Sequence, residues 1–263
     1  MAFDQKIIRE RYSDAAREDN RSTISRARGI EFHYSKKILS KYINLESSVL
    51  EIGCGTGYYG LHFYSKCKEY IGIDLSPENI QMFNDKINSK KINNIKAIVG
   101  NATKLDNIND SVYDVVLVLG PMYHLSLEKR ELVIKESKRV CKIGGIIIYA
   151  YINKLGAYLN GILRLPEKYP NKNANKLVLL KETDDIFTDI FYYTTPEKIA
   201  ENAIKYGLKI IKNIGVDFIF GETIINEMDE EKYKCWLEFS DYMCMSESCT
   251  ELSTHALLIC KKE

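Results

Sequence analysis

Short apolar runs alternate with amphipathic stretches along the first 152 residues of the chain. A near-continuous apolar run is typical of a parallel strand that is covered on both faces, so these runs predict buried strands. The predicted strands are Val49–Ile52, Tyr70–Ile73, Ile95–Val99, Tyr113–Leu119 and Ile146–Ile152. Helices are predicted at 58–66, at 77–89 after a cap at Ser76, and at 126–140, and a turn is predicted at 142–145 before the last of these strands. This alternation indicates an α/β fold with a doubly wound parallel sheet and right-handed crossovers.

The alternation stops after residue 152. Residues 153–192 combine a short apolar segment with a loop rich in Lys and Asn around Pro166–Lys176, and we expect them to form an insertion over the ligand edge of the sheet. A helix is predicted from Pro196, with Thr195 as its cap and Gly207 as its stop. Two more strands are predicted, at Lys209–Val216 and His255–Cys260, with an amphipathic segment at 230–245 between them. We therefore expect one domain over residues 1–263, with a core at 46–152, the insertion, and a C-terminal part of the sheet at 193–263.

Residues 1–45 are predicted to be helical and carry six arginines interleaved with acidic residues. One interpretation is a solvated helix face with many exposed ion pairs. The other is a helical lid, whose Tyr12 or Arg21 closes over a ligand.

The charge balance argues against a polyanionic partner. The chain has 37 Lys and Arg and 36 Asp and Glu, for a net charge of +1. No bulk field therefore attracts it to nucleic acid or to an acidic membrane. A local groove lined by lysines 168, 172, 176 and 181 is the alternative.

The cellular location is predicted from the absence of a targeting pattern near the N-terminus and of an apolar run long enough to span a membrane. No apolar stretch follows Lys6 and Arg9, and the longest apolar run, Ile146–Ile152, is too short to span a bilayer. We expect a soluble, cytoplasmic protein without a membrane segment. The seven cysteines include no C-x-x-C pair, which favours reduced thiols. The irregular spacing of Cys235, Cys244 and Cys249, with no nearby His, predicts no metal site.

The first predicted strand ends in a turn with Gly53, Gly55 and Gly57, and a helix begins at Tyr58. Glycines let the backbone turn sharply and approach a ligand closely, and the helix directs its positive end toward it. Asp74 closes the second strand, 21 residues after Gly53, where a carboxylate can accept hydrogen bonds from ribose hydroxyls. The sequence therefore predicts a site for a nucleotide-like ligand.

Tyr58 and Glu51 distinguish between a dinucleotide and a cationic nucleotide-like ligand. The dinucleotide fingerprint G-x-G-x-x-G places a third glycine at position 58, where this chain has Tyr58. Glu51, two residues before the first glycine, suits an ammonium or sulfonium cation better than a pyrophosphate.

The motif Glu51-Ile-Gly-Cys-Gly-Thr-Gly57, with Asp74 at the end of strand two, resembles the cofactor motif of class I S-adenosylmethionine-dependent methyltransferases. The run from Leu119 to Leu125 is similar to the L-G-P-x-Y-H-L motif of a bacterial subgroup that acts on small molecules. The resemblance implies S-adenosyl-L-methionine as cofactor. It also implies a seven-stranded sheet of order 3-2-1-4-5-7-6 with an antiparallel last strand.

The resemblance also implies roles for individual residues. Glu51 would lie near the cofactor's amino group, and Asp74 would hold the ribose hydroxyls. Asn101 stands where the family usually has Asp, and would accept a hydrogen bond from the adenine amine. The full set of implied cofactor-binding residues is Glu51, Gly53, Cys54, Gly55, Gly57, Asp74, Leu75, Asn101, Ala102, Leu119 and Gly120, with Tyr12 and Arg21 from the lid.

Methyl transfer from a sulfonium is an in-line displacement, in which positioning contributes about 7–11 kcal/mol. His124 is the candidate general base, because its usual pKa range suits proton removal near neutrality. The alternative is a histidine that only shapes the loop. Tyr123 either orients a substrate or covers the core. The loop at 119–122 lacks the Asn/Asp-Pro-Pro-Tyr device for nucleobase amines.

We therefore expect a methyltransferase with a small-molecule acceptor, as a monomer or a homodimer. The alternatives are a nicotinamide-dependent oxidoreductase on the related fold, a methyltransferase for RNA or protein, and a binding module without activity.

Overall fold

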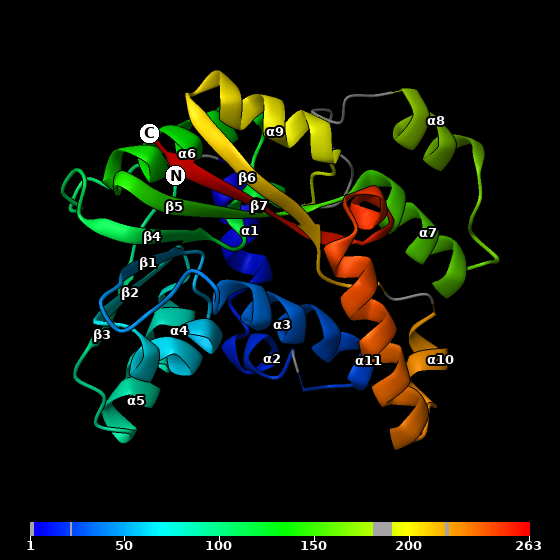
Figure 1. Ribbon diagram of the computed structural model, residues 1–263, viewed down its shortest axis with the longest axis horizontal. Coiled ribbons are helices and arrows are strands. Elements are labelled where there is room, and N and C mark those ends of the chain that lie inside the picture. The colour runs from blue at the N-terminus through cyan, green and yellow to red at the C-terminus, as the bar shows by residue number, and fades with distance from the viewer. Residues whose placement is uncertain (1–2, 22, 181–190, 219–220) are drawn as a thin grey trace.

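Seven strands form one sheet in the computed structural model, which describes residues 3–21, 23–180, 191–218 and 221–263 (Figure 1). The strands are β1 (Ser48–Ile52), β2 (Glu69–Asp74), β3 (Ile95–Val99), β4 (Tyr113–Val118), β5 (Cys141–Ile152), β6 (Leu208–Gly215) and β7 (His255–Lys262). Their order is β3-β2-β1-β4-β5-β7-β6. The first five pair in parallel, and β7 is antiparallel to both of its neighbours. The expected order and orientation are confirmed.

Helices cover both faces of the sheet (Figure 1). They are α1 (Phe3–Arg11), α2 (Ala15–Asp19), α3 (Arg26–Leu39), α4 (Tyr58–Phe63), α5 (Pro77–Ser89), α6 (Leu127–Val140), α7 (Lys154–Arg164), α8 (Lys172–Leu180), α9 (Pro196–Lys205), α10 (Glu222–Asn226) and α11 (Glu230–Met245). Three 3-10 turns complete the described chain, η1 (Tyr64–Lys66), η2 (Pro121–Tyr123) and η3 (Glu247–Leu252). One buried cluster packs α3, α4, α5 and α11 on one face, and a second packs α6 and α9 on the other. The sheet is thus the middle of three layers.

Local sequence accounts for where the helices begin and end. Ser76 accepts a hydrogen bond from the backbone N–H of Asn79, and Pro77 occupies the first position of α5, where a missing N–H costs nothing. Thr195 caps α9 in the same way, and Gly207 follows that helix with a φ of +71°. These boundaries agree with those expected from the sequence.

Two local predictions were wrong. The segment around 142–145 was expected to be a turn before the fifth strand, yet β5 already begins at Cys141. Its pairing with β4 shifts register between Tyr113 and Val115, and Gly144 has a φ of +78°, so the glycine forms an irregularity inside the strand. The loop expected up to Lys176 instead becomes helix α8 at Lys172. Lys181 and the rest of 181–190, which belong to the expected insertion, lie outside the described residues.

None of the helices in the described ranges combines the length and the apolar character that crossing a bilayer requires.

Candidate functional site

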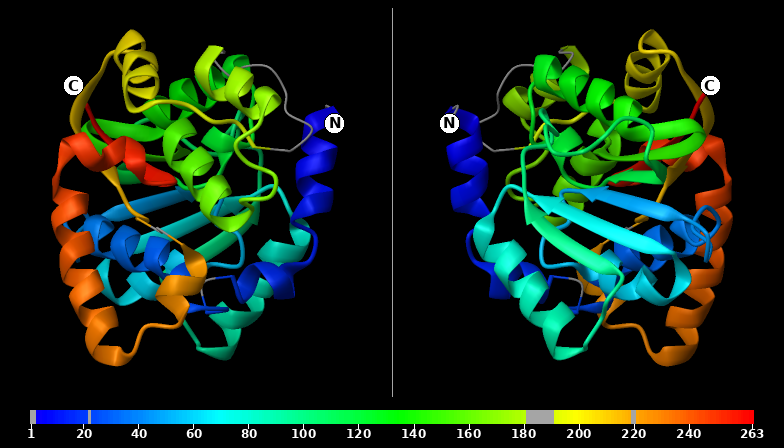
Figure 2. Two further views of the ribbon diagram at one scale, coloured as in Figure 1. Left: turned by 90° about the vertical axis from the view of Figure 1, so that its right-hand side faces the viewer. Right: turned by 90° about the vertical axis from the view of Figure 1, so that its left-hand side faces the viewer.

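A cavity lies at the edge of the sheet where the parallel strands end. Its walls come from the glycine turn after β1, the ends of β2 and β3, the loop after β4, and the N-terminal segment up to α3. Because the carboxyl ends of parallel strands meet at one edge, residues far apart in the sequence converge here. Helices α1 and α2 lie along this edge beside α5 (Figure 2).

The glycine turn has a shape that side chains would prevent. Gly53 has a φ of +85°, and a Cβ on it would lie 2.8 Å from Cδ of Pro121. Gly57 has a φ of +86°, and a Cβ there would lie 2.1 Å from a ring carbon of Phe83. Both the left-handed backbone and the close neighbours therefore require glycine. The turn leaves Gly53, Cys54 and Gly55 lining the cavity.

Asp74 connects the end of β2 to the glycine turn. Its Oδ2 accepts a hydrogen bond from the N–H of Gly55 at 2.8 Å, and its Oδ1 accepts one from the N–H of Ser76 at 2.9 Å. The side chain of Asn79 also faces this carboxyl, and Asp74 lines the cavity. Burial raises the pKa of Asp74.

Glu51 is a buried acid in β1, 1% exposed. Its Oε2 accepts a hydrogen bond from the Tyr70 hydroxyl at 2.7 Å. Burial raises the pKa of this carboxyl to about 8, although the Tyr70 hydrogen bond opposes the shift. Since Glu51 also lines the cavity, a cation that enters would favour its ionised form.

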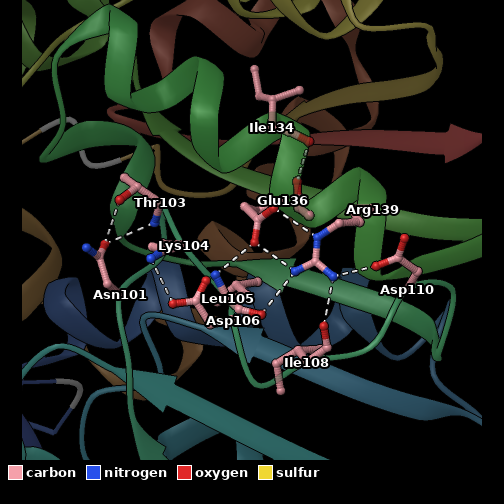
Figure 3. A network of polar contacts seen from close by, with 11 residues as sticks. Asn101, Thr103, Lys104, Leu105, Asp106, Ile108, Asp110, Ile134, Glu136 and Arg139 are labelled. Carbon is pink, nitrogen blue, oxygen red and sulfur yellow. Dashed lines mark hydrogen bonds and ion pairs between the residues drawn. The ribbon is translucent and has the colours of Figure 1, made fainter.

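Hydrogen bonds from side chains hold the loop after β3, as Figure 3 shows. Asn101 Oδ1 accepts hydrogen bonds from both the N–H and the hydroxyl of Thr103, at 3.0 and 2.9 Å. The side-chain oxygen expected to accept the adenine amine is thus already used within its own turn. Farther along the loop, Arg139 of α6 donates to the carbonyls of Leu105 and Ile108. Asn101 and Ala102 both line the cavity.

The N-terminal helices are attached to the cavity's rim at three places. The Tyr12 hydroxyl lies 2.9 Å from Nε2 of His124, in the loop after β4. Asp19 accepts a hydrogen bond from the Thr56 hydroxyl at 2.9 Å and pairs with Lys86 of α5. Arg9 pairs with Glu78 at 3.6 Å. Residues 3–21 therefore close over the cavity in this structure.

Arg21 lines the cavity from this segment. Its guanidinium lies 5.1 Å from the centre of the Phe32 ring, and its Nε is 3.6 Å from Oε1 of Glu18. Its Nε is buried without a hydrogen-bond partner among the described residues. Burial alone would lower the pKa of Arg21, but the carboxylates of Glu31 and Glu18 raise it above its usual range.

Tyr123 and His124 lie in and just after η2, and both are buried. The Tyr123 carbonyl accepts a hydrogen bond from the N–H of Tyr192 at 2.8 Å, and the Phe191 ring lies 5.0 Å from that of His124. The end of the insertion therefore packs on this loop. No residue of α7 or α8 lines the cavity, so among the described residues the insertion reaches the site only through the segment that begins at Phe191.

Most residues predicted from the sequence come together at this cavity. Tyr12, Arg21, Glu51, Asp74, Leu75, Leu119, Gly120, Tyr123 and His124 line it, with the glycine-turn and Asn101-Ala102 residues above. Gly57 does not; it packs against Phe83 and begins α4. The described residues contain no group of His, Cys, Asp and Glu that could hold a metal ion.

Sequence reasoning missed a second titratable cluster beside Tyr123. His255 Nδ1 lies 2.6 Å from Oδ2 of Asp217, and 3.9 Å from Oε2 of Glu31. Asp217 directly follows the predicted sixth strand and His255 opens the predicted last one. A polar residue at the ligand edge was the signal that could have identified both.

Comparisons with known proteins agree with this geometry. Residues 49–145 match the sequence profile of the family described as "Methyltransferase domain". An uncharacterized methyltransferase of Schizosaccharomyces pombe is 29% identical over 125 residues, which are 46% of this chain and 44% of that protein. The match thus spans less than half of the relative's length.

Two solved structures share the whole fold. The magnesium protoporphyrin IX methyltransferase of Synechocystis with bound S-adenosylhomocysteine has a TM-score of 0.64 at 12% identity, covering 98% of this chain and 100% of that one. A chain of the structure described as "Complex between the Haloferax volcanii Trm112 methyltransferase activator and the putative methyltransferase" has a TM-score of 0.63 at 15% identity, covering 97% of this chain and 96% of that one. The chain thus combines the Rossmann-like fold of S-adenosylmethionine-dependent methyltransferases with a sequence match to a methyltransferase domain over residues 49–145.

Proposed function

We propose that this protein is a methyltransferase that uses S-adenosyl-L-methionine and transfers the methyl group in line to a small-molecule acceptor. One observation carries the proposal. A single cavity joins the glycine turn and Asp74 at one end to Tyr12, Arg21 and His124 at the other. The methyltransferase-domain match covers the first of these ends.

The side chains along this cavity fit the cofactor from end to end. Asp74 would accept hydrogen bonds from the ribose hydroxyls, and the glycine turn admits a ligand where a Cβ would collide. Glu51 would pair with the amino group, which would hold its carboxyl ionised. Arg21, whose Nε has no hydrogen-bond partner among the described residues, would take the carboxylate. Ala102 would face the adenine through its backbone, because Asn101 Oδ1 is used within its turn.

When bound, the cofactor supplies an electrophilic methyl group on a sulfonium, so the protein's task is mainly positioning. The N-terminal helices exclude water from the cavity through the contacts of Tyr12, Asp19 and Arg9. His124 would receive the acceptor's proton, and the hydrogen bond between its Nε2 and the Tyr12 hydroxyl would hold its ring in place. Tyr123 would orient the acceptor beside it.

This proposal also assigns a role to each part of the chain. Residues 1–45 act as the lid, 46–152 hold the cofactor, 153–192 form the insertion, and 193–263 complete the sheet. A closed lid favours a small acceptor, because an RNA or protein chain would have to enter past α1 and α2. The near-neutral net charge of +1 gives no general attraction to RNA.

Calorimetry tests the cofactor first. We expect S-adenosylhomocysteine to bind the purified protein and NAD not to bind. Binding of NAD alone would identify a nicotinamide enzyme instead.

Incubation with methyl-labelled cofactor and separated cell-extract fractions then tests the acceptor. We expect label in the small-molecule fraction. Label only in the RNA or protein fraction would overturn the small-molecule acceptor while leaving the methyltransferase intact. Tight cofactor binding with no label in any fraction would indicate a binding module.

A further inference from the structure

Beside Tyr123, five charged side chains form a chain of alternating sign. Asp217 contacts the His255 ring at 2.6 Å, and His255 lies 3.9 Å from Glu31. Arg21 lies 3.6 Å from Glu18, and the charges of Glu31 and Glu18 both raise the pKa of Arg21. Three of the five are acids and two are cations. The group connects the N-terminal segment to the strands on the far half of the sheet.

The cluster lies at the same sheet edge as the cofactor cavity but over different strands. Asp74 and Asn101 follow β2 and β3, on one side of β1. Tyr123 follows β4, Asp217 follows β6, and His255 begins β7 opposite the last residue of β5. A cofactor that extends from Asp74 to Arg21 would therefore have His255 and Asp217 beyond its methionine end.

Asp217 fixes the orientation of His255. Its Oδ1 accepts hydrogen bonds from the backbone N–H of His255 at 2.6 Å and from the Ser253 hydroxyl at 2.8 Å, and its Oδ2 contacts the His255 ring at Nδ1. The other ring nitrogen, Nε2, makes no hydrogen bond within the described parts of the chain, although 26% of the side chain is exposed. A histidine held at Nδ1 by a buried acid presents Nε2 to a ligand in one orientation.

His255 acts there as a hydrogen-bond donor. Burial lowers its pKa, but the facing carboxylates of Glu31 and Asp217 outweigh this effect and the opposing charge of Arg21, raising the pKa of His255 to about 9. Nε2 therefore carries a proton at neutral pH. The Tyr123 hydroxyl also makes no hydrogen bond within the described ranges, and its ring lies 6.3 Å from that of His255. Tyr123 lines the cavity and His255 lies next to it, so two donors stand close together, and they suit an oxygen atom.

The charged and aromatic side chains around this position limit the chemical class of the acceptor further. Three carboxylates against two cations disfavour a phosphorylated acceptor, whose added negative charge would be repelled. The Phe32 ring lies against Arg21, and the rings of Tyr123 and Phe191 lie against His124; these aromatic side chains suit a flat apolar group.

We propose that His255, oriented by Asp217, binds the oxygen of the methyl acceptor, and that the acceptor is an uncharged hydroxylated aromatic compound. The proposal rests on the methyltransferase function argued above. In the reaction, a bond forms between the acceptor oxygen and the methyl carbon. The carbon–sulfur bond breaks, its electron pair stays on sulfur, and the hydroxyl proton passes to His124.

The test uses the whole protein saturated with S-adenosylhomocysteine and three fluorescent probes: 2-naphthol, naphthalene and 2-naphthyl phosphate. We expect 2-naphthol to bind more tightly than both others. His255→Gln should weaken 2-naphthol binding about tenfold, the loss expected for a charge-assisted hydrogen bond. Naphthalene binding should not change. His33→Gln, the same change at an exposed histidine of α3, is the matched control.

Asp217→Asn separates binding from folding. Without this carboxylate the pKa of His255 falls, so 2-naphthol binding should be lost at a lower pH than in the unaltered protein. Equal 2-naphthol binding by His255→Gln, or tighter binding of the phosphate ester, would overturn the proposal. Affinity for S-adenosylhomocysteine, measured for each variant, reports whether the cofactor half is intact. If the unaltered protein does not bind it, the proposed function itself fails.

Discussion

The hydroxyl of Tyr12 lies 2.9 Å from Nε2 of His124, joining two residues 112 positions apart. Their rings also meet edge to face, with centres 5.2 Å apart. Burial raises the pKa of Tyr12 to about 12, so this hydroxyl keeps its proton at neutral pH. The contact ties the first helix to the loop where we place the reacting methyl group, and so couples lid closure to the geometry of His124.

Tyr12→Phe keeps the ring contact and removes the hydrogen bond. A neutral hydrogen bond contributes about 0.5–1.5 kcal/mol, so we expect affinity for S-adenosylhomocysteine to fall about two- to tenfold. Calorimetry measures this directly. Tyr42→Phe, at a half-buried tyrosine that does not line the cavity, should leave affinity unchanged. An unchanged affinity in Tyr12→Phe would mean that the lid closes without this contact.

His124→Asn tests proton transfer at the same contact. If His124 receives the acceptor's proton, the acid limb of the pH–rate profile should flatten, because that limb reports protonation of the base. The measurement is kcat/KM against pH with the acceptor found in the extract screen. A profile that keeps both its shape and its height would make His124 part of the scaffold only.

Glu51→Gln should raise stability and weaken cofactor binding. Because the pKa of Glu51 is about 8 in the folded protein and near 4.5 when unfolded, the folded state holds more protons between these values. The free energy of unfolding therefore falls as pH rises through this window. Gln cannot ionise, so the variant's advantage in melting temperature should grow from pH 5 to pH 8.

In the same variant, affinity for the cofactor should fall while stability rises. Without the carboxylate, affinity for S-adenosylhomocysteine should fall more than about tenfold, since a charged hydrogen bond to the ammonium is lost. Glu46→Gln, at an exposed position, is the control for both measurements. A variant that is no more stable at pH 8 would show that Glu51 is not held as a buried acid.

The fold was predictable because its information is local. The strand at Tyr113–Val118, the glycine turn and the cap at Ser76 each follow from a few neighbouring residues, and parallel pairing then brings strand ends together. The same rule brought Asp74 and His124 to one cavity.

The features that the sequence did not predict depend mostly on contacts between distant segments or on the details of one turn. His255 and Asp217 are 38 positions apart and meet only because β7 inserts between β5 and β6. The use of Asn101 by Thr103 is a turn preference that overrides the role expected from the resemblance. The start of α8 at Lys172 lies in a stretch whose polar composition favours a loop, so propensity alone misplaced it.

Asp74→Ala should weaken binding of S-adenosylhomocysteine more than about tenfold, because hydrogen bonds from the ribose to a charged acceptor are lost. The change also frees the N–H groups of Gly55 and Ser76, which loosens the turn. Asp85→Ala, on the exposed face of α5, controls for removing a carboxylate from the same region. Calorimetry gives the affinity; an unchanged value would remove Asp74 from the site.

Gly57→Ala should destabilise the protein by about 3 kcal/mol or more, from two separable causes. The left-handed backbone, at a φ of +86°, costs about 1–2 kcal/mol for any residue with a Cβ. The new methyl would also lie 2.1 Å from the Phe83 ring, and such overpacking typically costs a further 1–3 kcal/mol. Gly144→Ala is the matched control, because its φ is +78° and a Cβ there has no neighbour within 4 Å. Urea unfolding of both variants should therefore show a clearly larger loss at Gly57. Phe83→Leu added to Gly57→Ala should recover part of that difference, and equal losses at the two glycines would show that Phe83 yields without cost.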